Sequence, residues 1–328
     1  MCIRDSMFSF SNYAKDNIGA TSMISDASYI DTLKAFPQNI EIRTVRTFQR
    51  KPPMGSALEK MIAQYYNSTG PMTYELNSSM LLLPKEPMKP RLYDPRVGYF
   101  AVGYKDFDGN PHGMKYKANI PRWRLEPKDE DKERYLRGEL VEPKKPIVIY
   151  IDPATPKKWV PYLIQGVNDW QKAFEKAGFK NAIIAKEITD SMTVDMDDVN
   201  YSVLTYAAST KANAMGPSIL DPRSGEILEA DIMWWHNVLN MLQEWITVQT
   251  GTVRPEARGI KLSDELMGDA MRFVACHEVG HSLGLRHNMM GSWAFPTDSL
   301  RSKSFTDRMN STSSSIMDYA RFNYVAQP

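Results

Sequence analysis

The sequence predicts an α+β protein, in which a β-rich N-terminal region precedes a catalytic-type domain of strands and helices. Three observations support this fold class. Residues 40–48 (IEIRTVRTF) alternate apolar and polar side chains, the period of a half-buried strand. Residues 147–151 (IVIYI) form a continuous apolar run, which is typical of a strand covered on both faces. Apolar side chains then recur at spacings of three and four over residues 159–177, which indicates a helix of about five turns.

The N-terminal region carries little chemistry of its own. Residues 73–83 and 97–104 resemble further strands, and no histidine, cysteine or paired-carboxylate cluster accompanies them. We therefore expect residues 1–127 to form a β-rich accessory region. A scaffold, an inhibitory propeptide-like region and a substrate-binding exosite all remain open for it. Residues 128–145 contain the mixed-charge run KDEDKERYLR and are predicted to be a connector.

The remaining residues, 146–328, are predicted to form a second domain of strands and helices. Its expected strands are residues 147–151, 181–188, 201–207, 217–220 and 227–233, and its expected later helices are residues 235–250 and 263–283. The last helix has a clear start signal. Ser263 can cap its first turn, and Asp264 and Glu265 suit the positive end of the helix dipole.

Composition excludes several classes of protein. The 328 residues carry 40 Lys and Arg against 39 Asp and Glu, a formal net charge of +1. A nucleic-acid-binding protein or one built for an anionic membrane surface is expected to be basic, so neither is predicted. No apolar run approaches the ~18 residues of a membrane-spanning helix. Two cysteines, Cys2 and Cys276, cannot build a disulfide framework or a four-cysteine zinc site, so a metal would need histidine and carboxylate ligands.

One motif concentrates the scarce histidines on the last predicted helix. The segment CHEVGHSLGLRHN, residues 276–288, places His277 and His281 four residues apart, so both imidazoles project from one helical face. Two nitrogens on that face can reach one metal ion at ~2.0–2.1 Å. Glu278 is rotated by roughly 100° from His277, which favours action on a water molecule over direct ligation.

The rest of the motif supplies a third ligand. Gly284 allows the helix to end in a left-handed turn, after which the chain doubles back and brings His287 to the metal. Three histidines leave a fourth position open, which is typical of catalytic zinc. The remaining histidines are expected to be bystanders: His112 on the surface, and His236 in packing or capping. Cys276 is expected to be a small buried core residue.

This arrangement resembles the metzincin family of zinc proteases. HExxHxxGxxH is their signature, and residues 313–325 (SSSIMDYARFNYV) fit their Met-turn, with Met317 thirty residues after His287. Together with GPSILDPRSGEILEADIMW and GLRHNMMGS, the C-terminal part is similar to large bacterial zinc-dependent metzincin proteases with long N-terminal domains. The resemblance covers about residues 146–328 and implies a twisted, mostly parallel sheet with a long helix and the HExxH helix.

The resemblance also implies a mechanism and site residues. His277, His281 and His287 would bind one Zn²⁺, and Glu278 would activate a zinc-bound water to hydrolyse peptide bonds. Met317 would form a hydrophobic floor, and Tyr319 would stabilise the transition state. A peptide or protein substrate would lie extended and pair with the edge strand near Gly216, Pro217, Ser218, Ile219 and Leu220, the predicted substrate-binding residues.

Two alternative functions and two questions of context stay open. The chain could be a zinc hydrolase of a non-peptide substrate, or a degenerate protease homologue that acts as a binding module, although the intact Glu278 speaks against the latter. The resemblance implies export to the periplasm, cell surface or medium, but the sequence shows no signal peptide. The unrelated opening MCIRDS and an end eleven residues past Met317 indicate a fragment of a longer protein.

Overall fold

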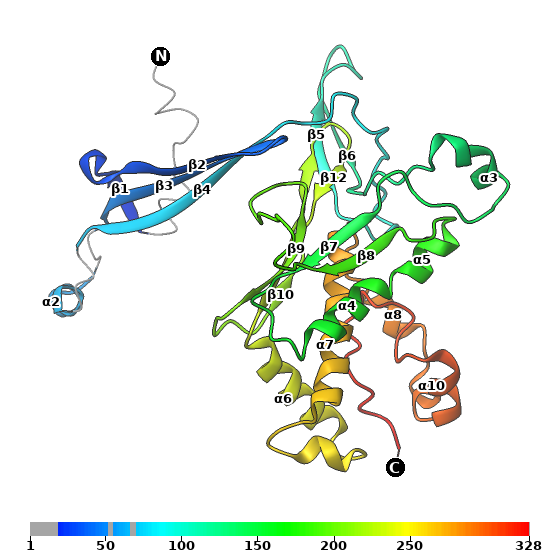
Figure 1. Ribbon diagram of the computed structural model, residues 1–328. Helices are drawn as coiled ribbons and strands as arrows, with labels where there is room; N and C mark the ends of the chain where they lie inside the picture. The colour runs from blue at the N-terminus through cyan, green and yellow to red at the C-terminus, as the bar shows by residue number, and fades with distance from the viewer. Residues whose placement is uncertain (1–18, 52–54, 66–69, 328) are drawn as a thin grey trace. The chain divides into compact units, whose positions relative to one another are not determined.

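The computed structural model describes residues 19–51, 55–65 and 70–327 (Figure 1). The opening residues MCIRDS and Cys2 lie outside the described residues. The chain divides into two compact units, residues 1–82 and 83–328. These units are compact parts of the fold and do not test the predicted domain boundaries at residues 127 and 146, which stay a prediction.

The first unit is an antiparallel sheet. The central strand of this sheet, β3 (Asn39–Arg50), pairs with the other three strands. Three buried side chains from different strands of the sheet, Ala20, Phe48 and Met72, form a small core. The predicted strands at 40–48 and 73–83 are present here, as β3 and β4. The other elements are β1 (Ala20–Met23), β2 (Tyr29–Ala35), α2 (Ala57–Tyr65) and β4 (Met72–Leu81).

The second unit contains a five-stranded sheet in the order β10-β13-β9-β7-β8. The β7–β8, β7–β9 and β9–β13 pairs are parallel, whereas β10 at the edge pairs antiparallel to β13. The mostly parallel sheet is thus confirmed. Its strands are β7 (Ile147–Ile151), β8 (Ile183–Glu187), β9 (Ser202–Ala207), β10 (Ala214–Met215) and β13 (Ile232–Trp235). Two small hairpins accompany it, β5 (Val102–Asp106) with β6 (Lys115–Asn119) and β11 (Ile219–Asp221) with β12 (Glu226–Glu229).

Helices α4 (Val160–Asn168), α6 (Val238–Thr250) and α7 (Asp264–Ser282) contribute buried side chains to one apolar core with this sheet (Figure 1). Alternate residues of β7 (Ile147, Ile149 and Ile151) are buried in it together with Leu163 of α4, while the residues between them on β7 are only half-buried. The helices are α3 (Lys132–Leu136), α4 (Val160–Asn168), α5 (Gln171–Lys176), α6 (Val238–Thr250), α7 (Asp264–Ser282), α8 (Met290–Trp293), α9 (Thr297–Leu300) and α10 (Lys303–Met309). Within the described part of the chain, no helix has the length and apolarity needed to cross a membrane.

The predicted single helix over residues 159–177 is in fact two helices, α4 and α5. The break falls at Asp169 and Trp170, and both residues are held by α7. The Asp169 carboxylate accepts two hydrogen bonds from the Arg272 guanidinium at 2.6 and 2.7 Å, and the Trp170 indole donates to the Cys276 carbonyl at 2.8 Å. Anchoring at both residues fixes the turn that periodicity alone could not reveal.

Two predicted strands are also shorter or divided. Residues 227–233 are divided between β12 and β13, which lie in different sheets. The division falls where the Ala230 amide donates a hydrogen bond to the Ser202 hydroxyl and the Asp231 carboxylate accepts one from the Val203 amide, both on β9. Of residues 97–104, only the part from Val102 belongs to β5. Tyr99 instead forms an isolated bridge with Leu285.

Packing of α4 against α7 provides a test of the core. We expect Leu163→Ala to lower the free energy of unfolding by about 2–5 kcal/mol, since the side chain is 0% exposed and its removal leaves a cavity. Leu136→Ala, at a position 84% exposed, should change it by less than about 0.5 kcal/mol. Urea unfolding of both variants checks this expectation, and equal effects would contradict it.

Candidate metal centre

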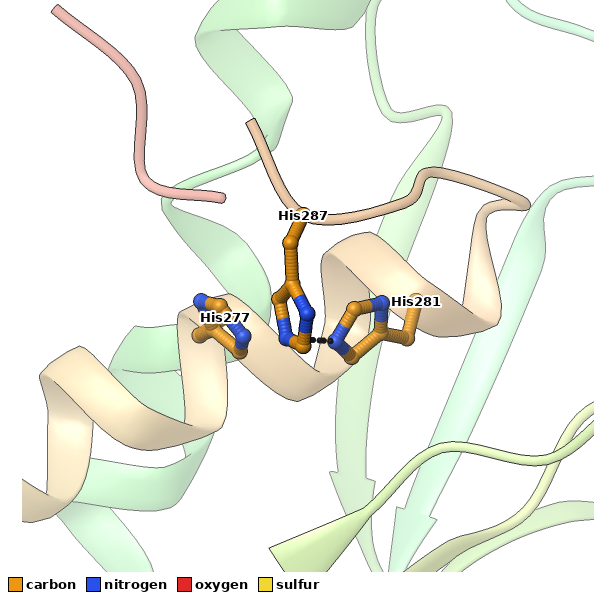
Figure 2. A group of neighbouring side chains, drawn as sticks. All are labelled: His277, His281 and His287. Carbon is orange, nitrogen blue, oxygen red and sulfur yellow. Dashed lines mark hydrogen bonds between the residues drawn. The ribbon is translucent and has the colours of Figure 1, made fainter. Parts of the chain in front are cut away.

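Helix α7 begins as its sequence predicts. The Ser263 hydroxyl accepts a hydrogen bond from the Leu266 amide at 3.2 Å, and Asp264 and Glu265 occupy the first turn. The helix then continues to Ser282. His277 and His281 therefore project from the same face one turn apart, with ring centroids separated by 4.8 Å (Figure 2).

The turn after α7 returns the chain to this face. Gly284 has a φ of +95°, which only glycine adopts without strain, and a Cβ there would lie 2.3 Å from the Pro121 carbonyl oxygen. Beyond it, His287 points back toward the helix, and its Nε2 lies 3.1 Å from Nε2 of His281 (Figure 2). One ring nitrogen from each histidine lies within 4.8 Å of the other two. The structure thus brings the three predicted ligands together.

Backbone carbonyls orient two of these rings. Nδ1 of His277 donates to the Ile316 carbonyl at 2.7 Å, and Nδ1 of His281 donates to the Leu285 carbonyl at 2.8 Å. A carbonyl oxygen can only accept, so both Nδ1 atoms carry the proton and both Nε2 atoms keep a lone pair. This outer hydrogen bond is what metal-binding histidines normally make.

The donor set fits a zinc ion. Nε2 of His277 is buried and has no hydrogen-bond partner within the described part of the chain, an expensive arrangement unless a ligand occupies the site. Two nitrogens around tetrahedral zinc lie about 3.3 Å apart, close to the 3.1 Å between His281 and His287. Burial lowers the pKa of His277 to about 4 and lowers the pKa values of His281 and His287, so the rings are neutral at neutral pH, as metal binding requires.

Met317 lies beneath this cluster. Its side chain is 3% exposed and packs against α7 at Gly280, where a Cβ would meet the Met317 sulfur. The turn that carries Met317 also supplies the Ile316 carbonyl, and the Met317 carbonyl accepts from the Asn288 amide at 2.7 Å. The turn therefore contacts both the helix and the third-ligand loop.

Glu278 is buried beside the histidines. It lines a cavity of about 150 Å³ together with His277 and Tyr319, and it is not among the residues that line the larger cavity at His281 and His287. None of the described residues donates a hydrogen bond to its carboxylate, so burial raises its pKa to about 7 without compensation. A carboxyl with a pKa near neutrality suits proton transfer.

Tyr319 lies over the histidines, with its ring centroid 4.3 Å from that of His287 and 5.5 Å from that of His277. Its side chain is 47% exposed, and burial of the remainder raises the pKa of its hydroxyl, which stays protonated at neutral pH. Arg321 stacks on both Tyr319 and Trp245, with its guanidinium carbon 4.8 and 3.4 Å from the two ring centroids.

A larger cavity of about 1270 Å³ opens beside the metal ligands. Four of the five predicted substrate-binding residues line it together with His281 and His287: Gly216, Pro217, Ser218 and Leu220. Ile219 belongs to β11 and is not among the lining residues. Gly216 itself lies against α7, since a Cβ there would be 2.6 Å from the Glu278 carbonyl oxygen.

The expected bystanders lie away from the cluster's chemistry. His112 is exposed, and Nδ1 of His236 is 2.8 Å from the Tyr206 hydroxyl. The Cys276 thiol has a pKa raised to about 12 by burial, so it is not a reactive thiolate.

Some contributors have no signature in the sequence. The orienting groups at Ile316 and Leu285 are backbone carbonyls, which any residue would supply. Phe100, whose ring centroid is 5.7 Å from that of His281, is too remote in sequence for any motif to include it. Arg321 lies within the predicted Met-turn, four residues after Met317, but its stacking on Trp245 depends on the fold.

Comparison with protein families agrees with this geometry. Residues 259–328 match a family described as Met-zincin, and residues 3–128 match a family described as Domain of unknown function (DUF5117). No curated protein and no solved structure matches the chain. The Met-zincin match contains the three histidines, Gly284 and Met317, and it confirms the resemblance drawn from the motif.

The cluster makes a direct prediction for metal affinity. We expect His277→Ala to raise the zinc dissociation constant at least about 100-fold, because a ligand and its oriented lone pair are lost. His112→Ala should leave it unchanged. Competition with a chromophoric chelator measures both, and a His277→Ala variant that kept its affinity would remove His277 from the ligand set.

Proposed function

With residues 259–328 forming a Met-zincin segment, we propose that the chain is a zinc-dependent endopeptidase. The observation that carries the proposal is the convergence of three neutral imidazoles beside a buried carboxyl group. His277, His281 and His287 hold the ion. When bound, zinc supplies Lewis-acid polarisation of a carbonyl oxygen and acidifies water.

Glu278 acts as the general base and then as the general acid. Its carboxylate takes a proton from the attacking water and delivers a proton to the leaving amine of the cleaved peptide bond. The pKa of about 7 supports this role, since a group that titrates near neutrality can both accept and return a proton. Among the residues that the structure describes, none donates a hydrogen bond to either carboxylate oxygen, so both are available for this exchange.

Tyr319 contributes a hydroxyl donor for the charge that develops on the carbonyl oxygen. Its ring contacts with His287 and His277 hold it above the ligands, and its protonated state at neutral pH provides the donor. Met317 takes no chemical part. It fills the space beneath the ligands and holds the turn that orients His277.

The substrate lies extended along the 1270 Å³ cavity. Strand β10 is an edge strand of the five-stranded sheet, the kind of position at which an extended peptide can be added. Gly216, Pro217 and Ser218 follow β10 directly and line the cavity next to the histidines. A peptide added to this edge would pass the ligands.

Export of the protein stays a prediction.

Glu278→Gln is the sharpest test of the mechanism. We expect kcat for a peptide substrate to fall by about 10²–10⁴-fold, because the amide cannot accept the proton. Zinc stoichiometry should stay at that of the wild type. Glu265→Gln, in the exposed first turn of the same helix, is the matched control and should keep full activity.

Two results would contradict the proposal. Full activity of Glu278→Gln would exclude Glu278 as the base. A wild-type protein that binds zinc but cleaves nothing in a broad peptide library would exclude endopeptidase activity and favour a non-peptide substrate or a binding module.

Tyr319→Phe tests the hydroxyl alone. The ring and its contacts with the histidines remain, so zinc affinity should not change. We expect kcat to fall by about tenfold or more, because a donor to the developing oxyanion is lost, with little change in KM. An unchanged kcat would make Tyr319 a packing residue.

A further inference from the structure

Residues 97–100 pair with the loop between the second and third metal ligands. The Phe100 amide donates to the Gly284 carbonyl at 2.9 Å, and the Arg286 amide donates to the Gly98 carbonyl at 2.8 Å. Between these two bonds, Tyr99 and Leu285 form an antiparallel bridge. The chain thus makes a short two-stranded ladder next to the metal centre, although the two segments are far apart in sequence.

The ladder meets the centre at two points. Leu285, paired with Tyr99, is the residue whose carbonyl accepts the hydrogen bond from Nδ1 of His281. The ring of Phe100 lies 5.7 Å from the ring of His281, centroid to centroid. A shift of residues 97–100 would therefore move the group that orients His281 and the wall that confines its ring.

The same ladder controls the approach of His287. After Gly284, only Leu285 and Arg286 precede this ligand, and both take part in the ladder. Loops with unpaired backbone groups sample many conformations, and each unproductive one separates His287 from the other two ligands. Pairing on residues 97–100 removes this freedom.

From these contacts, we infer that residues 97–100 are a positioning element of the metal centre, supplied by a part of the chain outside the Met-zincin match. They act through Leu285 and the His287 loop and do not touch the ion. The segment also lines the 1270 Å³ cavity on which the substrate was placed, so one element serves both the metal and the cleft. This inference rests on the metal binding of the proposed function and is independent of peptidase activity.

Phe100→Pro removes the amide that donates to Gly284. We expect the zinc dissociation constant to rise about tenfold or more, as for the loss of other groups that orient ligands. The absorption spectrum of the cobalt-substituted variant should also change, because it reports ligand geometry. Phe107→Pro is the matched control: it lies in the exposed β5–β6 turn, where proline is tolerated, and should match the wild type in both measurements.

Phe100→Ala separates the ring from the backbone. It keeps the amide donor and removes only the contact with His281. We expect a smaller loss of zinc affinity than for Phe100→Pro and a cobalt spectrum close to that of the wild type. If both variants weaken binding equally, the ring and not the ladder is responsible, and the inference is overturned.

Hydrogen exchange on the unaltered protein tests the same coupling without any folding risk. If the ladder favours metal binding, zinc must stabilise the ladder by the same factor. The amides of Phe100 and Arg286 should therefore exchange at least about tenfold more slowly with zinc than without it. Equal rates would overturn the inference. A protein with slowed exchange but no peptide cleavage would retain the inference and refute the proposed endopeptidase.

Discussion

The hydrogen bond from Nδ1 of His277 to the Ile316 carbonyl joins the helix that carries two ligands to the turn that carries Met317. Because a carbonyl cannot donate, this bond places the proton on Nδ1 and leaves the Nε2 lone pair facing the other histidines. The Met317 side chain holds this turn against α7, because it occupies the space that the missing side chain of Gly280 leaves. If the turn moved, His277 would lose its orientation, and neither His281 nor His287 could restore the three-nitrogen cluster.

Burial has opposite effects on the two kinds of group at the centre. It opposes charge, so it lowers the pKa of His277 and raises that of Glu278. The histidines are consequently neutral and able to bind a cation. The Glu278 carboxyl group next to them, with a pKa of about 7, is partly protonated and partly ionised at neutral pH. One physical cause, exclusion of water from the end of α7, thus acts on both the candidate ligands and the proposed base.

The sequence was most informative where one local element decides the outcome. The Ser263 cap, the His277–His281 spacing and the turn at Gly284 follow from helix geometry and were predictable. The α4–α5 break was not, because it depends on Asp169 and Trp170 reaching α7. Residues 97–100 had strand character, but their partner lies in a loop far along the chain, and periodicity carries no information about long-range pairing. The substrate-binding assignment at residues 216–220 stays a prediction, even though four of the five line the cavity.

The contact between Gly284 and the Pro121 carbonyl crosses from one family match to the other. Nearby, the Trp123 indole donates to the Ser282 carbonyl at 2.9 Å, where α7 ends. Two segments that match different protein families are thus in direct contact in the fold. A chain that joined the Met-zincin segment to a different N-terminal segment would therefore lack the surface against which the end of α7 and the turn at Gly284 are fitted.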